Sequence, residues 1–289
     1  MSLSTELSYC PAPAKLGGGG VAFDWTTMNQ IGSMTELGFG WITPILSYVM
    51  ACVGSALGLR CTVRALAAEG RARRGWLING AMAIGTGIWT MHFIAMLGFG
   101  VTGTDVRYDV TLTVLSLIVA IAVVGIGVFA VGYLSSRTLA VLLGGLVSGI
   151  GVAAMHYLGM AAMRLSGSVS YDPVVVALSV MIAIAAATAA LWATLTIRGP
   201  AAAVGASLVM GVAVSAMHYT GMAAVEVDVH AAHGATPGAT PMQFIFPLTV
   251  VLGSYLFLTS AFVALSARPP KITDEVEKSS DQAGSQLAL

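Results

Sequence analysis

The sequence predicts an all-α, polytopic membrane protein with seven transmembrane helices. Of its 289 residues, 57% are hydrophobic and 9% are charged, whereas a soluble domain carries about 25% charged residues. Such a composition is not that of a water-soluble enzyme. The formal net charge is zero, so no long-range attraction to a polyanion is expected and nucleic acid is not an expected partner.

Seven apolar stretches are each long enough to cross a bilayer, for which a helix needs about 20 residues. The stretches are continuously apolar and contain no Asp, Glu or Lys in their interiors, which favours helices over the alternating strands of a membrane barrel. Residues 1–39 are predicted to form an outer tail and residues 267–289 a disordered cytoplasmic tail. The predicted helices are residues 40–60, 76–99, 110–133, 139–163, 173–197, 201–225 and 244–266.

The basic residues predict the orientation of the helices. Ten of the 13 Lys and Arg residues lie on one side of the predicted membrane segment and three on the other. Because cytoplasmic loops carry an excess of Lys and Arg, the richer side is expected to be cytoplasmic. The N-terminus is then outside and the C-terminus is inside. Five of the ten are in the predicted loop between the first two helices, namely Arg60, Arg64, Arg71, Arg73 and Arg74.

A Met-His motif recurs three times, on alternate predicted helices. The copies read Met91-His92-Phe93-Ile-Ala-Met96, Met155-His156-Tyr157-Leu-Gly-Met160 and Met217-His218-Tyr219-Thr-Gly-Met222, with the histidines 64 and 62 residues apart. Each histidine is expected about seven residues before the outer end of its helix. Consecutive copies span one helical hairpin, so the pattern predicts three helical-hairpin repeats followed by a final helix. If the three motif helices meet, their imidazoles converge at one depth.

The residue types in the motif favour a soft metal ion. Within each copy, the Met four residues after the His lies on the same helix face, and the preceding Met lies about 100° around the helix. Imidazole and thioether together suit copper, above all Cu(I), whereas hard cations prefer oxygen ligands. The alternative is packing, because Met fills irregular gaps. The candidate ligands are His92, His156, His218, Met96, Met160, Met222, Met91, Met155 and Met217.

The motif resembles that of the MHYT domain family of bacterial seven-helix membrane sensors, over residues 40–266. The resemblance implies a metal site, with copper as the metal, near the outer face of the bacterial inner (plasma) membrane. It also implies that oxygen, carbon monoxide or nitric oxide is the sensed ligand. Tyr157 and Tyr219 are expected either to orient the ligands or donate hydrogen bonds to them, or to be aromatic residues near the outer interface, and the first copy has Phe93 at this position. Only the third copy spells Met-His-Tyr-Thr.

Three functions remain open on the sequence. The first is a copper-binding sensor of a diatomic gas or of redox state, which signals through a separate cytoplasmic partner. The second is copper transport or handling, and the third is a haem protein in which two of the three histidines are axial ligands. No Ser-His-acid set or pair of carboxylates occurs in the membrane part, so the chain is not expected to be an enzyme.

Overall fold

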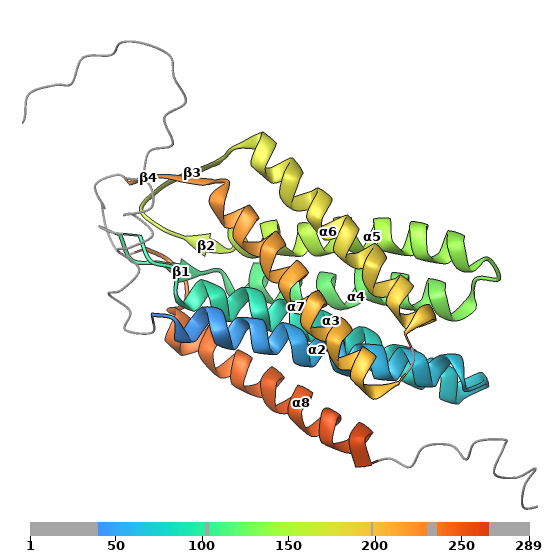
Figure 1. Cartoon of the computed structure of the whole chain (residues 1–289). Coiled ribbons are helices and arrows are strands. Elements are labelled where there is room, and N and C mark those ends of the chain that lie inside the picture. Colours follow the sequence, from blue (N-terminus) through green and yellow to red (C-terminus); the bar gives the residue numbers. More distant parts are fainter. Residues whose placement is uncertain (1–39, 102–103, 198, 230–235, 266–289) are drawn as a thin grey trace, which may run out of the picture.

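The computed structural model describes residues 40–101, 104–197, 199–229 and 236–265. Seven helices within these ranges are long and apolar enough to cross a membrane, which confirms the predicted fold class. The predicted tails, residues 1–39 and 267–289, lie outside the described residues. The helices are α2 (Ile42–Leu66), α3 (Gly70–Leu97), α4 (Val110–Tyr133), α5 (Arg137–Ala161), α6 (Pro173–Thr196), α7 (Pro200–Ala223) and α8 (Phe246–Leu265), the last preceded by the π-helical turn η2 (Pro241–Ile245) (Figure 1).

Six of the helices form a closed ring of three hairpins. Each helix from α2 to α6 packs against the next one, and α7 packs back against α2. The three motif helices α3, α5 and α7 also contact one another across the middle of this ring. Helix α8 lies outside it, along α2 and α3 (Figure 1). The architecture is therefore three repeated hairpins and a final helix, as the motif spacing predicts.

The basic connection between the first two helices differs from its prediction. Only residues 67–69 separate α2 from α3. Arg60 and Arg64 are part of α2, and Arg71, Arg73 and Arg74 are in the first turns of α3. The predicted loop is therefore wrong in length. The helices continue past their apolar stretches because a helix satisfies its own backbone hydrogen bonds while long Arg side chains reach away from the apolar region.

Glycines allow the hairpin helices to pack backbone to backbone. Gly54 of α2 faces Gly87 of α3, and a Cβ on either residue would lie 2.7 Å from the Cα of the other. Between the second and third hairpins, Gly145 of α5 lies against the backbone of Thr188 in α6 at a similar separation. Small residues are common at membrane helix interfaces because association there depends on close van der Waals contact. These glycines hold the helices that carry the motifs.

Short strands gather at one end of the bundle, where the motif helices end (Figure 1). Strand β1 (Arg107–Tyr108) pairs with β2 (Met163–Arg164), and β3 (Gly167–Tyr171) pairs with β4 (Val225–Val229), both antiparallel. These strands differ from the predicted loops between the helices. The alternation Val-Glu-Val-Asp-Val in β4 is the period-two signal that indicates one of them.

Candidate metal centre

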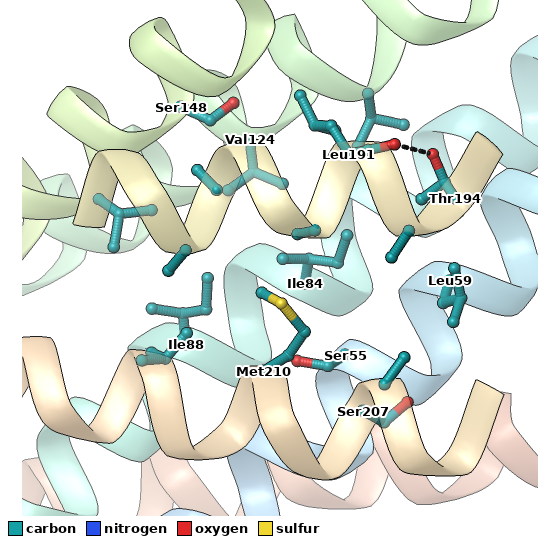
Figure 2. Close-up of a pocket in the computed structure, with 18 of the residues that line it drawn as sticks. Ser55, Leu59, Ile84, Ile88, Val124, Ser148, Leu191, Thr194, Ser207 and Met210 are labelled. Atoms are coloured by element: carbon teal, nitrogen blue, oxygen red, sulfur yellow. Dashed lines mark hydrogen bonds between the residues drawn. The ribbon is translucent and has the colours of Figure 1, made fainter. Parts of the chain in front are cut away.

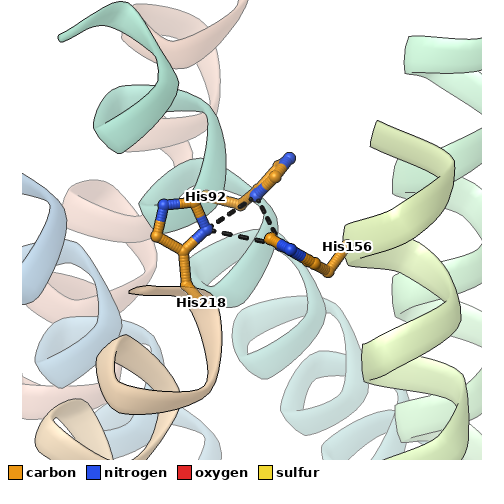
Figure 3. A group of neighbouring side chains, drawn as sticks. All are labelled: His92, His156 and His218. Atoms are coloured by element: carbon orange, nitrogen blue, oxygen red, sulfur yellow. Dashed lines mark hydrogen bonds between the residues drawn. The ribbon is translucent and has the colours of Figure 1, made fainter. Parts of the chain in front are cut away.

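The histidine cluster, His92, His156 and His218, lies at the middle of the helix ring near its strand-bearing end. The three side chains come from α3, α5 and α7 and point toward one another (Figure 3). Their Nδ1 atoms are 3.0 Å apart between His92 and His218, 3.1 Å between His92 and His156, and 3.3 Å between His156 and His218. All three are buried, with at most 1% of each residue exposed. The convergence expected from the motif register is thus present.

Each histidine lies five residues before the last residue of its helix, not the seven that were predicted. At 1.5 Å per residue, the histidine cluster is about 7.5 Å from the helix ends. The difference arises because all three helices end two residues before their predicted limits. Gly98 follows α3, and the chain turns toward strands β2 and β4 soon after α5 and α7.

Hydrogen bonds alone do not satisfy the histidine cluster. The Nδ1 atom of a neutral imidazole is either a donor or an acceptor. Three such atoms in mutual contact therefore include at least one pair of two donors or two acceptors. A cation approached by three lone pairs removes this conflict. The three Nδ1 atoms have a common centre about 1.8 Å from each, close to the metal–nitrogen distance of about 2.0–2.1 Å, so the donor set fits a metal ion.

Small residues hold the imidazoles in place. A Cβ on Gly159 of α5 would lie 2.5 Å from Nε2 of His92, and a Cβ on Gly221 of α7 would touch Nε2 of His156. Each glycine follows the histidine of its own helix by three residues, and Ala95 occupies this position in the first copy. Nε2 of both His92 and His156 is buried without a hydrogen-bond partner among the described residues. Close packing therefore replaces the acceptor that usually orients a metal-binding imidazole.

The motif methionines all belong to the interior around the histidine cluster. Five of them are at most 2% exposed, and Met222 is partly buried against the same core. Met217 also lines a cavity further along the bundle. Burial among apolar side chains fits both a ligand and a packing role, so their part in metal binding stays a prediction. The five buried methionines are Met91, Met96, Met155, Met160 and Met217.

The tyrosines that follow two of the histidines form hydrogen bonds to the neighbouring hairpins. The ring of Tyr157 meets that of His156 edge to face, with centroids 4.8 Å apart, while its hydroxyl lies 2.6 Å from Oγ of Ser179 on α6. Tyr219 packs on His218 in the same way, at 4.9 Å, and its hydroxyl bonds to Ser47 on α2. The hydroxyls therefore link one hairpin to the next, and the tyrosines contact the imidazoles through their rings.

In the first repeat, different residues form the hydrogen bond that links one hairpin to the next. Phe93 has no hydroxyl, and the indole Nε1–H of Trp89, one turn earlier, instead donates to Oγ of Ser116 on α4 at 2.9 Å. Ser116 is thus the counterpart of Ser179 and Ser47, and each of these serines is fully buried. Sequence reasoning missed them. For Ser116 and Ser179, the signal is a serine seven residues after the capping aspartates Asp109 and Asp172.

The strand-bearing loops close the bundle beside the histidine cluster. Tyr108 of β1 is buried and meets Phe93, with ring centroids 6.0 Å apart; Phe93 in turn contacts His92. Burial raises the pKa of Tyr108 well above its usual range. Asp109 caps α4 through the backbone N–H of Leu112 and pairs with Arg164 at 3.0 Å. The backbone N–H first, and then Arg164, lower the pKa of this carboxyl.

Six ring-forming helices with three converging histidines define a multi-pass membrane protein with a buried histidine cluster. Comparison with known families matches residues 85–145 and 149–207 to MHYT, described as the N-terminal repeat of bacterial signalling proteins. The chain belongs to this family. The matched repeats contain the first two motif copies. The third copy, which contains His218, follows the matched residues but contributes equally to the histidine cluster.

The relatives are bacterial signalling proteins. The chain is 39% identical over 214 residues to the bifunctional diguanylate cyclase/cyclic di-GMP phosphodiesterase MucR of Pseudomonas aeruginosa, covering 71% of this chain and 31% of MucR. It is 35% identical to the cyclic di-GMP phosphodiesterase NbdA of the same organism, over 78% of this chain and 29% of NbdA. The signaling protein YkoW of Bacillus subtilis is 32% identical, over 62% of this chain and 23% of YkoW.

The chain spans less than a third of the length of these relatives. No solved structure matches it. Family and relatives together support the role of a membrane sensor in signalling.

Proposed function

We propose that the histidine cluster binds one copper ion and that the chain senses a diatomic gas, or redox state, at this ion. The observation that carries the proposal is the set of three Nδ1 atoms 3.0–3.3 Å apart, in an interior where hydrogen bonds cannot satisfy all three. His92, His156 and His218 would hold the ion. Bound copper would supply an open coordination position for the gas or a change of oxidation state.

Copper is favoured over other metals by the surroundings of the histidine cluster. Imidazole suits several transition metals, and thioether ligands select Cu(I). The described histidine group includes no carboxylate or thiol, whereas structural zinc sites draw on Cys and complete a tetrahedron. The motif copies also carry methionines, which are buried in the same interior. Cu(I) bound by three imidazoles, with a thioether available, agrees with this donor set.

A haem is disfavoured by the spacing of the nitrogens. Two axial nitrogens on opposite faces of a haem iron are about 4 Å apart, twice a metal–nitrogen bond of about 2 Å. All three Nδ1 pairs here are closer than that. The glycine packing at Gly159 and Gly221 also leaves no space beside the imidazoles of His92 and His156. The haem alternative therefore has no support in the geometry.

Copper transport is less consistent with the interior than sensing is. A transport path needs successive ligands across the bilayer, yet the described residues contain one histidine group that could hold a metal ion. Toward the other end of the bundle, the interior is lined by aliphatic side chains and a few hydroxyls. The lining also holds the thioethers of Met210 and Met217, but two thioethers with no imidazole or thiolate beside them are not a second full ligand set for a soft metal ion. A single histidine site in an apolar bundle is more consistent with sensing than with transport.

The signal would leave through the motif helices. α3, α5 and α7 meet at the histidine cluster and extend to the opposite end of the bundle. A ligand that binds one arrangement of these helices more tightly shifts the population toward that arrangement. In this proposal, the end that bears Arg71, Arg73 and Arg74 is cytoplasmic and contacts a separate signalling partner, with no catalytic step in the described residues.

Elemental analysis of the purified protein tests the proposal. The test variant replaces His92, His156 and His218 by alanine, and the matched control replaces the two other histidines of the chain, His230 and His233. We expect about one copper per chain in the wild type and in the control, and none in the test variant, with unchanged helix content by circular dichroism. Absence of copper in the wild type after reconstitution with Cu(I) would overturn the proposal, and a Soret band would favour haem.

Orientation is tested separately by labelling. A single cysteine introduced at Arg71, in a background without native cysteines, should react with a membrane-impermeant maleimide only after the cytoplasmic side is exposed. Labelling of intact spheroplasts at this position would reverse the proposed topology.

A further inference from the structure

A second feature of the interior is an elongated cavity of about 70 Å³ on the side of the histidine cluster away from the strands. It lies between α6 and α7, with α2 to α5 behind (Figure 2). On α7 its lining extends from Met217 to Ala206, which is about 16 Å of helix. The cavity thus follows the bundle axis for roughly half of the thickness of a bilayer core.

The cavity ends one helical turn from the histidine cluster. Three of its lining residues, Ile88, Val152 and Val214, each precede a motif histidine by four residues. Residues four apart lie on one helix face, one above the other. The three aliphatic side chains therefore occupy the level directly next to the imidazoles, one from each hairpin, and Met217 lies between that level and His218 in the sequence.

The lining offers few groups that would bind water. It is formed mostly by alanine and aliphatic side chains. Of its four hydroxyls, those of Ser148, Thr194 and Ser207 already donate to backbone carbonyls at 3.2, 2.7 and 2.7 Å, and Ser55 carries the fourth. Water in a buried cavity needs two to four polar partners, and apolar cavities stay dry. The cavity is accordingly suited to an apolar occupant.

The volume limits the size of that occupant. An engineered apolar cavity of about 150 Å³ holds benzene or xenon, so a cavity of about 70 Å³ has room for a diatomic molecule or a xenon atom but not for a ring. Of its six half-buried lining residues, Ser55 and Ile84 lie on α2 and α3, and the other four lie on α6 and α7, namely Ala187, Ala190, Ala206 and Met210. The cavity is therefore least enclosed between these two helices, where lipid surrounds the bundle.

We infer that this cavity takes up diatomic gas from the bilayer between α6 and α7 and delivers it to the histidine cluster past Ile88, Val152 and Val214. The inference rests on the proposed function for the identity of the gas. The cavity itself, and its capacity to bind a small apolar molecule, do not depend on a metal. A gas that enters from the membrane interior reaches the centre without crossing the strand-bearing loops.

Xenon binding to metal-free protein tests the cavity alone. Crystals pressurised with xenon should show its density beside Met210 in the wild type. Met210→Trp and Ala187→Leu, which fill the cavity from α7 and from α6, should each abolish it. Val209→Trp, at the neighbouring position of α7 that is 67% exposed, is the matched control and should retain it. Absence of xenon from the wild type, or acyl-chain density in the cavity, would overturn the inference.

Carbon monoxide binding to the copper-loaded protein tests delivery. We expect association to be at least tenfold slower in the cavity-filling variants than in the wild type and in Val209→Trp, with equal copper content and equal equilibrium affinity. Equal association rates in all variants would overturn delivery through the cavity. Xenon binding with no copper in any variant would instead overturn the proposed function and leave the cavity as a binding site for apolar molecules.

Discussion

Replacing Gly159 by alanine is expected to disrupt the proposed metal centre without destabilising the helix that carries the glycine. The added Cβ would lie 2.5 Å from Nε2 and 3.1 Å from Cδ2 of His92, where ordinary contact begins at 3.4 Å. The imidazole must therefore retreat by about 1 Å. It is enclosed by Phe93 and by the two other histidines, so the retreat moves its Nδ1 atom out of the triangle.

The magnitude follows from how strictly a metal site holds its ligands. A binding constellation tolerates about 0.5 Å of displacement, and loss of the groups that orient a metal-binding side chain costs about 10- to 100-fold in affinity. We expect the Cu(I) affinity of Gly159→Ala to fall within that range. Intrinsic helix propensity acts in the opposite direction, because alanine is about 1 kcal/mol more favourable than glycine in a helix interior.

A competition titration with a chromogenic Cu(I) chelator measures the affinity, and circular dichroism measures helix content and thermal unfolding. Gly205→Ala on α7 is the matched control, because a Cβ at Gly205 meets nothing within 4 Å. It should bind copper as the wild type does. Copper affinity of Gly159→Ala within twofold of the wild type would refute the reasoning that glycine packing positions the imidazole.

Further perturbations test the surroundings of the histidine cluster. Leucine in place of the three methionines that follow the histidines by four residues conserves volume and should lower affinity for Cu(I) more than for zinc; unchanged affinities would assign these methionines to packing. Trp89→Phe removes the hydrogen bond to Ser116 and should lower the free energy of unfolding by about 1 kcal/mol. Adding Phe93→Tyr should restore part of it, and no recovery in calorimetry would disprove the equivalence of the repeats. The pKa of Asp109 is lowered in the folded state, so its contribution to stability is present above the unfolded value of about 3.9 and is lost as pH falls through the folded pKa. Asp109→Asn should accordingly show a smaller drop in Tm between pH 5 and pH 2.5 than the wild type; equal drops would contradict this account.

Sequence patterns predicted the positions of the helices better than their rotation. The bilayer thickness and the cost of unpaired backbone groups require long apolar helices. Such helices are identified from the hydropathy of the sequence alone. Apolar side chains, however, face both lipid and the bundle interior, so no amphipathic stripe marks the buried face as it does in a soluble helix. The motif copies supplied that information through the polar histidines alone.

The amino-acid sequence by itself therefore determined seven spanning helices, three parallel motif copies and one shared depth for the histidines, because helix length and repeat spacing are local properties. The tertiary structure decided what depends on contacts between hairpins. It brought the Nδ1 atoms within 3.3 Å, directed the Tyr157 hydroxyl to Ser179, replaced the missing hydroxyl of Phe93 by the indole of Trp89 and left an apolar cavity beside the histidine cluster. These contacts join residues 22 to 126 positions apart, and only the closing of the helix ring brings them together.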